Sequence, residues 1–237
     1  MSRKIMSISA VLLFFTVFAL PAQEHGFGYN PEVLRGEVWI ELEPVYGGYI
    51  DKEYPLDAEA ARRRALEESA LCYSAMIYGW SFHYDIGERA RRIPENLELV
   101  PMGSIAFGDP GMRATDVEIR DLRVRLWTDY RLSESQRRRL QVWRAGNTRS
   151  AQAVGYGPLG GPLDVSDWLT IKKAALEDAA RAAIRATLRG SERNRPKEAS
   201  GFISLATFPT YYIDGGRWAA SARFRVQISE IIPFAAY

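Results

Sequence analysis

The stretch "AVGYGPLGGPLDVSDW", Ala153–Trp168, joins a strand-like run to a strongly helical one. It contains the pattern G-x-G-x-x-G, starting at Gly155, which is typical of dinucleotide-binding turns. In such folds the last glycine opens the helix, so that the pyrophosphate lies on free N–H groups. Here Pro158 and Pro162 intervene, and the helix is expected to begin near Ser166. The stretch therefore predicts a crossover loop and not a nucleotide site.

The residues that follow support the same interpretation. "DWLTIKKAALEDAARAAIRATLRG" predicts a helix that is capped by Asp164 or Ser166 and ends at Gly190. Its apolar stripe consists of Leu169, Leu176, Ala180, Ile184 and Leu188. A dinucleotide fold needs a parallel strand next. The chain instead has a polar break and then Asp214-Gly215-Gly216, which predicts an antiparallel hairpin.

The first half repeats this order of elements. Alternation predicts a strand at Glu37–Glu43, and Asp57 precedes an alanine-rich helix that ends near Gly79. Further strands are expected at Trp80–Ile86, Met102–Gly108 and Asp116–Trp127. The run Arg139–Gly157 is expected to form a strand, or a hairpin that bends at Gly146-Asn147.

These patterns predict an α+β protein of two tandem modules. The expected boundaries are residues 36–133 for module 1 and residues 134–237 for module 2, after an N-terminal linker at residues 23–35. In each module one long Ala- and Arg-rich helix is expected to cover a small antiparallel sheet. Small side chains on the buried helix face predict that the helix lies close to the sheet.

Residues 1–22 are typical of a secretory signal peptide. Arg3 and Lys4 precede the apolar run Val11–Leu20, and Ala22 is a plausible cleavage point. Cleavage would reduce the 31 basic residues to 29, equal to the 29 acidic ones. The sequence therefore predicts a periplasmic protein with no nucleic-acid partner and no transmembrane segment after cleavage. A position peripheral to the outer membrane stays open.

Few side chains offer catalytic chemistry. We expect no metal site, because neither His25 nor His83 has a cysteine, histidine or carboxylate at metal-ligand spacing. We also expect no cofactor and no catalytic residue. Cys72, the single cysteine, falls on the buried stripe of its helix. A Cys72–His83 nucleophile pair stays open as a minor alternative. The neighbouring carboxylates Glu41 and Glu43, and Glu67 and Glu68, are expected to face solvent.

Aromatic residues at strand ends and loops are the candidate partner contacts, because tryptophan and tyrosine concentrate in interface hot spots. These candidates are Trp39, Trp127, Trp143, Tyr211 and Tyr212. Two arginine triplets, Arg62–Arg64 and Arg137–Arg139, are expected to lie on solvated surfaces or to contact an acidic partner.

Parts of both halves resemble a known family. "QAVGYGPLGGP", the helix after it and "GRWAASARFRVQI" are similar to the N-terminal domain of flagellar assembly protein T and related outer-membrane lipoproteins. "YPLDAEAARRRALEESALCYSAMIYGW", "VPMGSIAFG" and "DVEIRDLRVRLWTDY" follow in the same order in the first half. The resemblance implies a non-enzymatic structural role in the cell envelope. The chain lacks the lipidated cysteine of the lipoproteins, so direct anchoring is not implied.

The expected function is that of a non-enzymatic exported structural or assembly protein of the cell envelope, with association with the flagellum left open. It would act through contacts with envelope or flagellar proteins, or with copies of itself. The alternative is a periplasmic small-molecule-binding module with an apolar pocket between helix and sheet. Closely packed alanine-lined helices argue against that pocket.

Overall fold

The computed structural model describes residues 32–43, 54–87, 92–159, 168–191 and 196–233. The predicted signal peptide at 1–22 and most of the predicted linker at 23–35 lie outside the described residues. The described elements, in chain order, are β1 (Val33–Glu41), α1 (Ala58–Ile77), β2 (Trp80–Asp85), β3 (Asn96–Pro101), β4 (Met112–Arg120), β5 (Arg123–Arg131), α2 (Glu134–Ala145), β6 (Arg149–Tyr156), α3 (Trp168–Ser191), β7 (Pro196–Leu205), β8 (Thr210–Asp214) and β9 (Arg217–Pro233).

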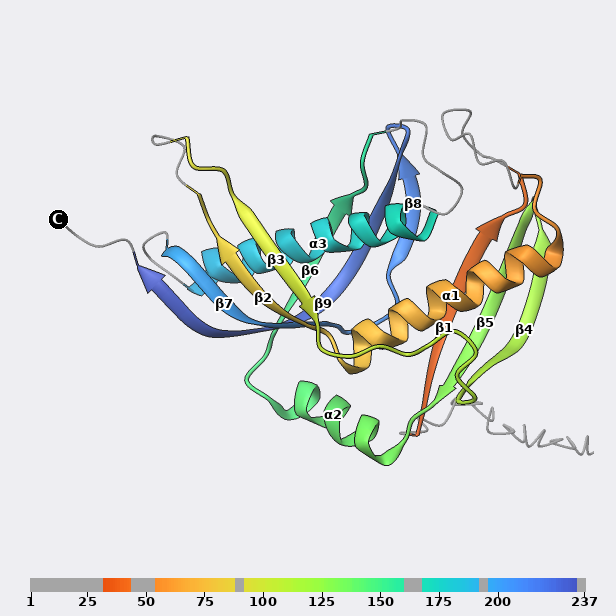
Figure 1. Cartoon of the computed structure of the whole chain (residues 1–237), viewed down its shortest axis with the longest axis horizontal. Helices are drawn as coiled ribbons and strands as arrows, with labels where there is room; N and C mark the ends of the chain where they lie inside the picture. Colours follow the sequence, from red (N-terminus) through yellow and green to blue (C-terminus); the bar gives the residue numbers. More distant parts are fainter. Residues whose placement is uncertain (1–31, 44–53, 88–91, 160–167, 192–195, 234–237) are drawn as a thin grey trace, which may run out of the picture. The chain divides into compact units, whose positions relative to one another are not determined.

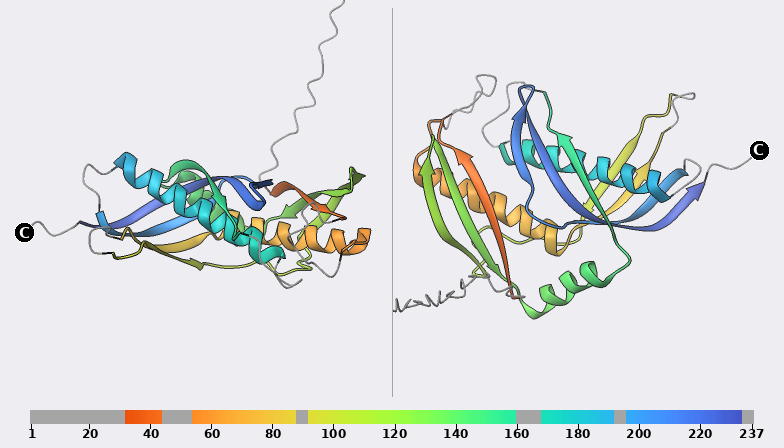
Figure 2. Two further views of the ribbon diagram at one scale, coloured as in Figure 1. Left: turned by 90° about the horizontal axis from the view of Figure 1, so that it is seen from above. Right: turned by 180° about the vertical axis from the view of Figure 1, so that it is seen from behind.

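The described strands form two antiparallel sheets (Figures 1 and 2). The smaller sheet has the order β1-β5-β4, and α1 packs on β1 and β5. The larger sheet has the order β3-β2-β7-β9-β6, with β8 also paired to β9, and α3 packs on β6 and β9. None of the helices in the described part of the chain combines the length and hydrophobicity that crossing a membrane requires.

The prediction of two tandem helix-covered modules is wrong. The described chain is mostly β, and its sheets do not follow the two halves of the sequence. Strands β2 and β3 come from the first half, yet β2 pairs with β7 of the second half, Trp80 opposite Ile203. Periodicity shows which side chains of a strand are buried, but it does not show which strand will be its neighbour.

The first part of Arg139–Gly157, which is expected to form a strand or a hairpin, is helical in the structure. Helix α2 occupies Glu134–Ala145, and β6 begins only at Arg149. The helix starts at a capping box, in which Ser133 Oγ accepts from Gln136 N and Gln136 Oε1 accepts from Ser133 N. This reciprocal pair satisfies two backbone donors and fixes the helix start.

The expected strand Asp116–Trp127 is a hairpin. Strands β4 and β5 pair through Arg120 and Arg123, and the turn residues Asp121 and Leu122 have φ of 52° and 58°. Two consecutive positive φ values are typical of the tight turns whose twist suits a hairpin. The strand expected at Met102–Gly108 is irregular chain.

Several local expectations are confirmed. The Asp57 side chain accepts from Ala60 N at the start of α1, and Gly79 follows the helix with φ of 68°. The turn at Gly215-Gly216 joins β8 to β9, with Asp214 opposite Arg217. Caps and tight turns depend on a few neighbouring residues, and the sequence therefore predicts them well.

The glycine pattern serves helix packing. A Cβ added at Gly155 in β6 would lie 1.9 Å from Ala179 N and 2.5 Å from Ala175 O, both backbone atoms of α3. Ala175, Ala179 and Ala183 of the same helix are fully buried. The expectation that an alanine-rich helix lies close to its sheet is therefore confirmed for α3.

A buried hydroxyl group joins α1 to the smaller sheet. Tyr73 Oη donates to the carbonyl oxygen of Thr128 at 2.7 Å, and it lies 3.3 Å from the carbonyl oxygen of Leu34. Burial raises the pKa of the Tyr73 phenol, so the hydroxyl group stays a donor at neutral pH. The ring stacks on Tyr130 with 5.3 Å between centroids.

Replacing Tyr73 by phenylalanine is expected to lower the free energy of unfolding by about 1 to 2 kcal/mol, because a buried carbonyl oxygen loses its donor. Urea unfolding followed by circular dichroism measures the loss. Tyr212→Phe is the control, since Tyr212 is only partly buried. Equal stability of Tyr73→Phe and the wild type would show that the hydrogen bond adds nothing.

Candidate functional site

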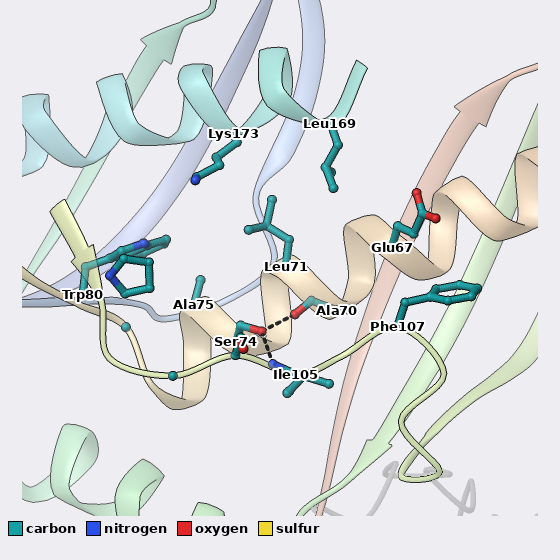
Figure 3. A pocket seen from close by; sticks show the side chains of 14 residues that line it. Glu67, Ala70, Leu71, Ser74, Ala75, Trp80, Ile105, Phe107, Leu169 and Lys173 are labelled. Atoms are coloured by element: carbon teal, nitrogen blue, oxygen red, sulfur yellow. Dashed lines mark hydrogen bonds between the residues drawn. The ribbon is translucent and has the colours of Figure 1, made fainter. Parts of the chain in front are cut away.

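A pocket of about 310 Å³ lies between α1, the chain at residues 101–107 and the start of α3 (Figure 3). Its wall is mainly apolar, and Leu71 of α1 and Leu169 of α3 extend into the space between the two helices. Ala70, Ala75, Trp80 and Ile105 are buried in the wall. The pocket is about half open to solvent, and its volume is near the lower end of the range for clefts that bind small molecules.

The lower wall is held in place by Ser74. Its Oγ donates to Ala70 O at 2.6 Å and accepts from Ile105 N at 2.8 Å (Figure 3). The second bond ties the irregular chain around Ile105 to helix α1. Gly103 is required nearby, because an added Cβ would lie 2.7 Å from the Tyr78 ring. The irregular segment is thus fixed as a wall of the pocket.

Two charged side chains also line the pocket. Glu67 of α1 and Lys173 of α3 line it from opposite helices, with 26% and 46% of the two side chains exposed. Each has an ion partner on its own helix, Arg63 for Glu67 at 3.1 Å and Glu177 for Lys173 at 3.7 Å. Exposed pairs of this kind contribute little to stability, and they leave the pocket interior apolar.

The residue adjacent to each of these two behaves differently. Lys172 Nζ lies 2.6 Å from Glu68 Oε2, and the two side chains are only 2% and 4% exposed. The pair links α3 directly to α1 beside the pocket. A buried ion pair needs both partners, because a single buried charge is strongly unfavourable.

Four aromatic rings surround the lysine. We call Lys172, Glu68, Glu41 and these rings the Lys172 cluster. Measured from Lys172 Nζ to the ring centroids, the distances are 4.7 Å to Trp218, 5.1 Å to Tyr211, 5.5 Å to Trp39 and 5.9 Å to Trp168. Ring faces attract a cation, and the attraction grows where water is excluded.

Burial controls the titration of the cluster. It raises the pKa of Glu68 and of Glu41, and the charge of Lys172 opposes both shifts. Burial also raises the pKa of the Cys72 thiol well above its usual value. A thiol without thiolate character is a poor nucleophile. The cluster therefore has the properties of a buried structural contact between α1 and α3.

The expectation that Glu41 and Glu68 face solvent is wrong, since both are buried. A signal for the cluster was present in the sequence. The predicted α3 stripe passes through Leu176, and Lys172 lies one turn before it on the same face. In α1, Glu68 stands four residues before Cys72, itself on the buried stripe.

The five candidate contact residues have different environments. Trp143 and Tyr211 are buried, and Trp143 Nε1 donates to Ile77 O at 3.1 Å. Trp39 packs on Trp218 with 5.7 Å between centroids. Trp127 and Tyr212 are partly buried. The structure thus places Trp39 and Tyr211 together in the Lys172 cluster and leaves the other three apart from it.

Other charged and reactive groups are also placed. Of the first arginine triplet, Arg64 is buried and lies over the rings of Tyr54 and Trp168, whereas Arg62 and Arg63 are exposed. Cys72 is in the core, while His83 is on an exposed sheet face beside Asp85 and Glu198. The residues that line the pocket include neither a histidine nor a cysteine.

The comparisons with known proteins correct the expected resemblance. A family model matches residues 28–234, and it describes an uncharacterised Treponema family. The chain is 23% identical over 201 residues to an uncharacterised protein of Treponema pallidum (strain Nichols). The aligned region covers 84% of this chain and 81% of that protein. No solved structure matches the chain.

The resemblance to flagellar assembly protein T and its related lipoproteins is wrong, because no such family is among the matches. It was based on alanine-rich helices, glycine turns and alternating strands, which many folds share. The match across residues 28–234 shows instead that the chain belongs to the uncharacterised Treponema family.

Proposed function

We propose that the protein is a non-catalytic binding protein that holds a small, mainly apolar ligand in the pocket between α1 and α3. The observation that carries the proposal is the mainly apolar lining of this 310 Å³ pocket, whose charged lining residues are Glu67 and Lys173. The sequence argued against a pocket between helix and sheet. The pocket found here lies between two helices and an irregular segment, so close packing of α3 on its sheet does not fill it.

The wall chemistry sets the ligand class. Leu71, Ile105 and Leu169 offer only carbon surface, and the Ser74 hydroxyl group is already engaged in two hydrogen bonds. Against this part of the wall, a polar ligand group would lose its hydration without gaining a partner. An apolar ligand group gains free energy on entering the pocket, because burying apolar surface contributes about 25 cal/mol per Å². We therefore expect the ligand to carry a ring or a branched alkyl group.

The proposed location is the periplasm or the envelope surface, with the leader-like residues 1–22 as support. Fractionation of cells that produce a C-terminally tagged chain tests the location. Recovery in the periplasmic fraction, at a mass reduced by the leader, is expected. Recovery in the cytoplasm at full mass would contradict it.

The pocket is tested with N-phenyl-1-naphthylamine, whose fluorescence rises in apolar surroundings. A ligand of about 17 heavy atoms at about 0.3 kcal/mol per atom corresponds to a dissociation constant on the order of 0.1 mM. Leu71→Glu is expected to weaken binding about tenfold or more, because a carboxylate would enter the apolar space.

The control is Val142→Glu, which makes the same kind of change on a helix at a side chain that is 66% exposed. It is expected to bind the probe like the wild type. Equal affinity of the wild type, Leu71→Glu and Val142→Glu would place the probe elsewhere and contradict the proposed site. Circular dichroism of each variant checks that the fold is kept.

A second candidate is the docking of a protein partner or of another copy of the chain. The observation in its favour is exposed apolar surface. Phe107, which lines the pocket, is 51% exposed, and Val100 of β3 is 49% exposed. Crosslinking of a tagged chain in cells, followed by mass spectrometry of the envelope fraction, tests it. Crosslinks that include residues 100–107 would favour a protein ligand, and an uncrosslinked chain would favour the small molecule.

A further inference from the structure

Three side chains with metal-binding atoms meet on the larger sheet, and they share no residue with the pocket. His83 Nε2 lies 3.4 Å from Asp85 Oδ1 and 3.9 Å from Glu198 Oε2. One donor atom from each of the three lies within 4.8 Å of the other two. We propose that His83, Asp85 and Glu198 form a binding site for a divalent transition-metal ion.

Strand geometry explains why these residues meet. His83 and Asp85 are two residues apart in β2, so both side chains are on the same face. Strand β7 runs antiparallel beside it, with Glu198 opposite Asp85 and therefore diagonal to His83. Two hydrogen-bonded strands inside a sheet hold the three residues on a rigid support, which favours a preorganised site.

The donor set defines the class of metal. One imidazole nitrogen and two carboxylate oxygens suit Zn²⁺, which binds such atoms at about 2.0 to 2.2 Å. Donors around one ion at that distance are about 3 to 4 Å apart, close to the separations seen here. An imidazole ligand disfavours Mg²⁺ and Ca²⁺, which prefer oxygen. Water would complete the coordination, because the His83 side chain is 47% exposed.

The charges around the three side chains are mixed, with one lysine and two further acidic residues. Lys197 Nζ pairs with Glu198 Oε1 at 2.6 Å, which leaves Oε2 on the side of His83. Glu98 lies opposite His83 on β3, and Glu230 lies opposite Ser200, the β7 partner of His83. Two further acidic residues thus flank the three proposed ligands.

Isothermal titration of the full chain with ZnCl₂ tests the site. One ion per chain is expected for the wild type. His83→Ala and Glu198→Gln are each expected to weaken binding at least tenfold, since each removes one of three protein ligands. The chain has two histidines, so His25→Ala is the matched control and should bind like the wild type.

A second measurement separates metal binding from simple ion pairing. In the NMR spectrum of the His25→Ala chain, the one imidazole signal is expected to shift on addition of one equivalent of Zn²⁺. The same titration with MgCl₂ is expected to leave it unchanged. Absence of stoichiometric Zn²⁺ binding, or unchanged binding in His83→Ala, would overturn the proposal and leave the three residues as a surface ion-pair cluster.

Discussion

Replacing Lys172 by methionine is expected to lower the free energy of unfolding by about 3 to 5 kcal/mol at pH 7.5. The change removes the cation that lies 2.6 Å from Glu68 and leaves that carboxylate buried among aromatic rings. Glu41 loses the same stabilising charge. Lys173→Met is the matched control, since this neighbour on the same helix is 46% exposed and should cost less than about 0.5 kcal/mol.

The loss should depend on pH in a defined direction. Burial raises the pKa values of Glu68 and Glu41 in the folded state above 4.5, and removing Lys172 raises them further. The folded chain then binds protons at these two carboxyl groups more tightly than the unfolded chain does. The stability that this proton binding contributes is fully present below pH 4.5 and is lost as pH rises through the raised pKa values. The deficit of Lys172→Met is therefore expected to be smaller at pH 5 than at pH 7.5.

A double variant distinguishes a broken pair from lost packing. Glu68→Leu combined with Lys172→Met replaces both charges of the pair by apolar groups. It should regain the part of the lost stability that comes from Glu68, while Glu41 still lacks the charge of Lys172. Urea unfolding at both pH values provides all the free energies needed. A double variant as unstable as Lys172→Met, or a deficit equal at pH 5 and pH 7.5, would contradict a buried ion pair.

Replacing Gly155 by alanine is expected to cost about 3 kcal/mol, which is large for a single methyl group. The added Cβ would meet Ala179 N at 1.9 Å and Ala175 O at 2.5 Å. Both are backbone atoms inside α3, so no side-chain rotation relieves the clash and the helix must move away from β6. The measurement is the midpoint of urea unfolding, with circular dichroism to check the helix content.

Gly108→Ala is the control for this substitution. Gly108 has φ of 83° and no atom within 4 Å of an added Cβ, so only backbone strain of about 1 kcal/mol is expected. If Gly155→Ala were no more destabilising than Gly108→Ala, α3 could shift freely on the sheet. The close packing described here would then be wrong.

Local features were predictable from the sequence, and long-range pairing was not. The cap at Asp57, the turn at Gly215-Gly216 and the helix that became α3 each depend on a few neighbouring residues. The position of β2 between β3 and β7 depends on a strand more than one hundred residues away. No alternation within β2 itself distinguishes that partner from a closer one.

The site was harder to predict for a related reason. Leu71, Ile105 and Leu169 come from three separate segments, and none of them carries a recognisable motif. Lys172 and Glu68 were missed because charged side chains are usually exposed. Helical spacing places Lys172 on the buried stripe, and a charge on such a stripe predicts an oppositely charged partner elsewhere in the chain.

The central claim is that the space between α1 and α3 takes up an apolar ligand, and a crystal structure with N-phenyl-1-naphthylamine bound tests it most directly. The naphthyl ring is expected between the two helices, within about 4 Å of Leu71, Ile105 and Leu169, the usual distance of apolar contact. A ring bound at another surface, with the pocket filled by water or by the protein's own side chains, would contradict the claim.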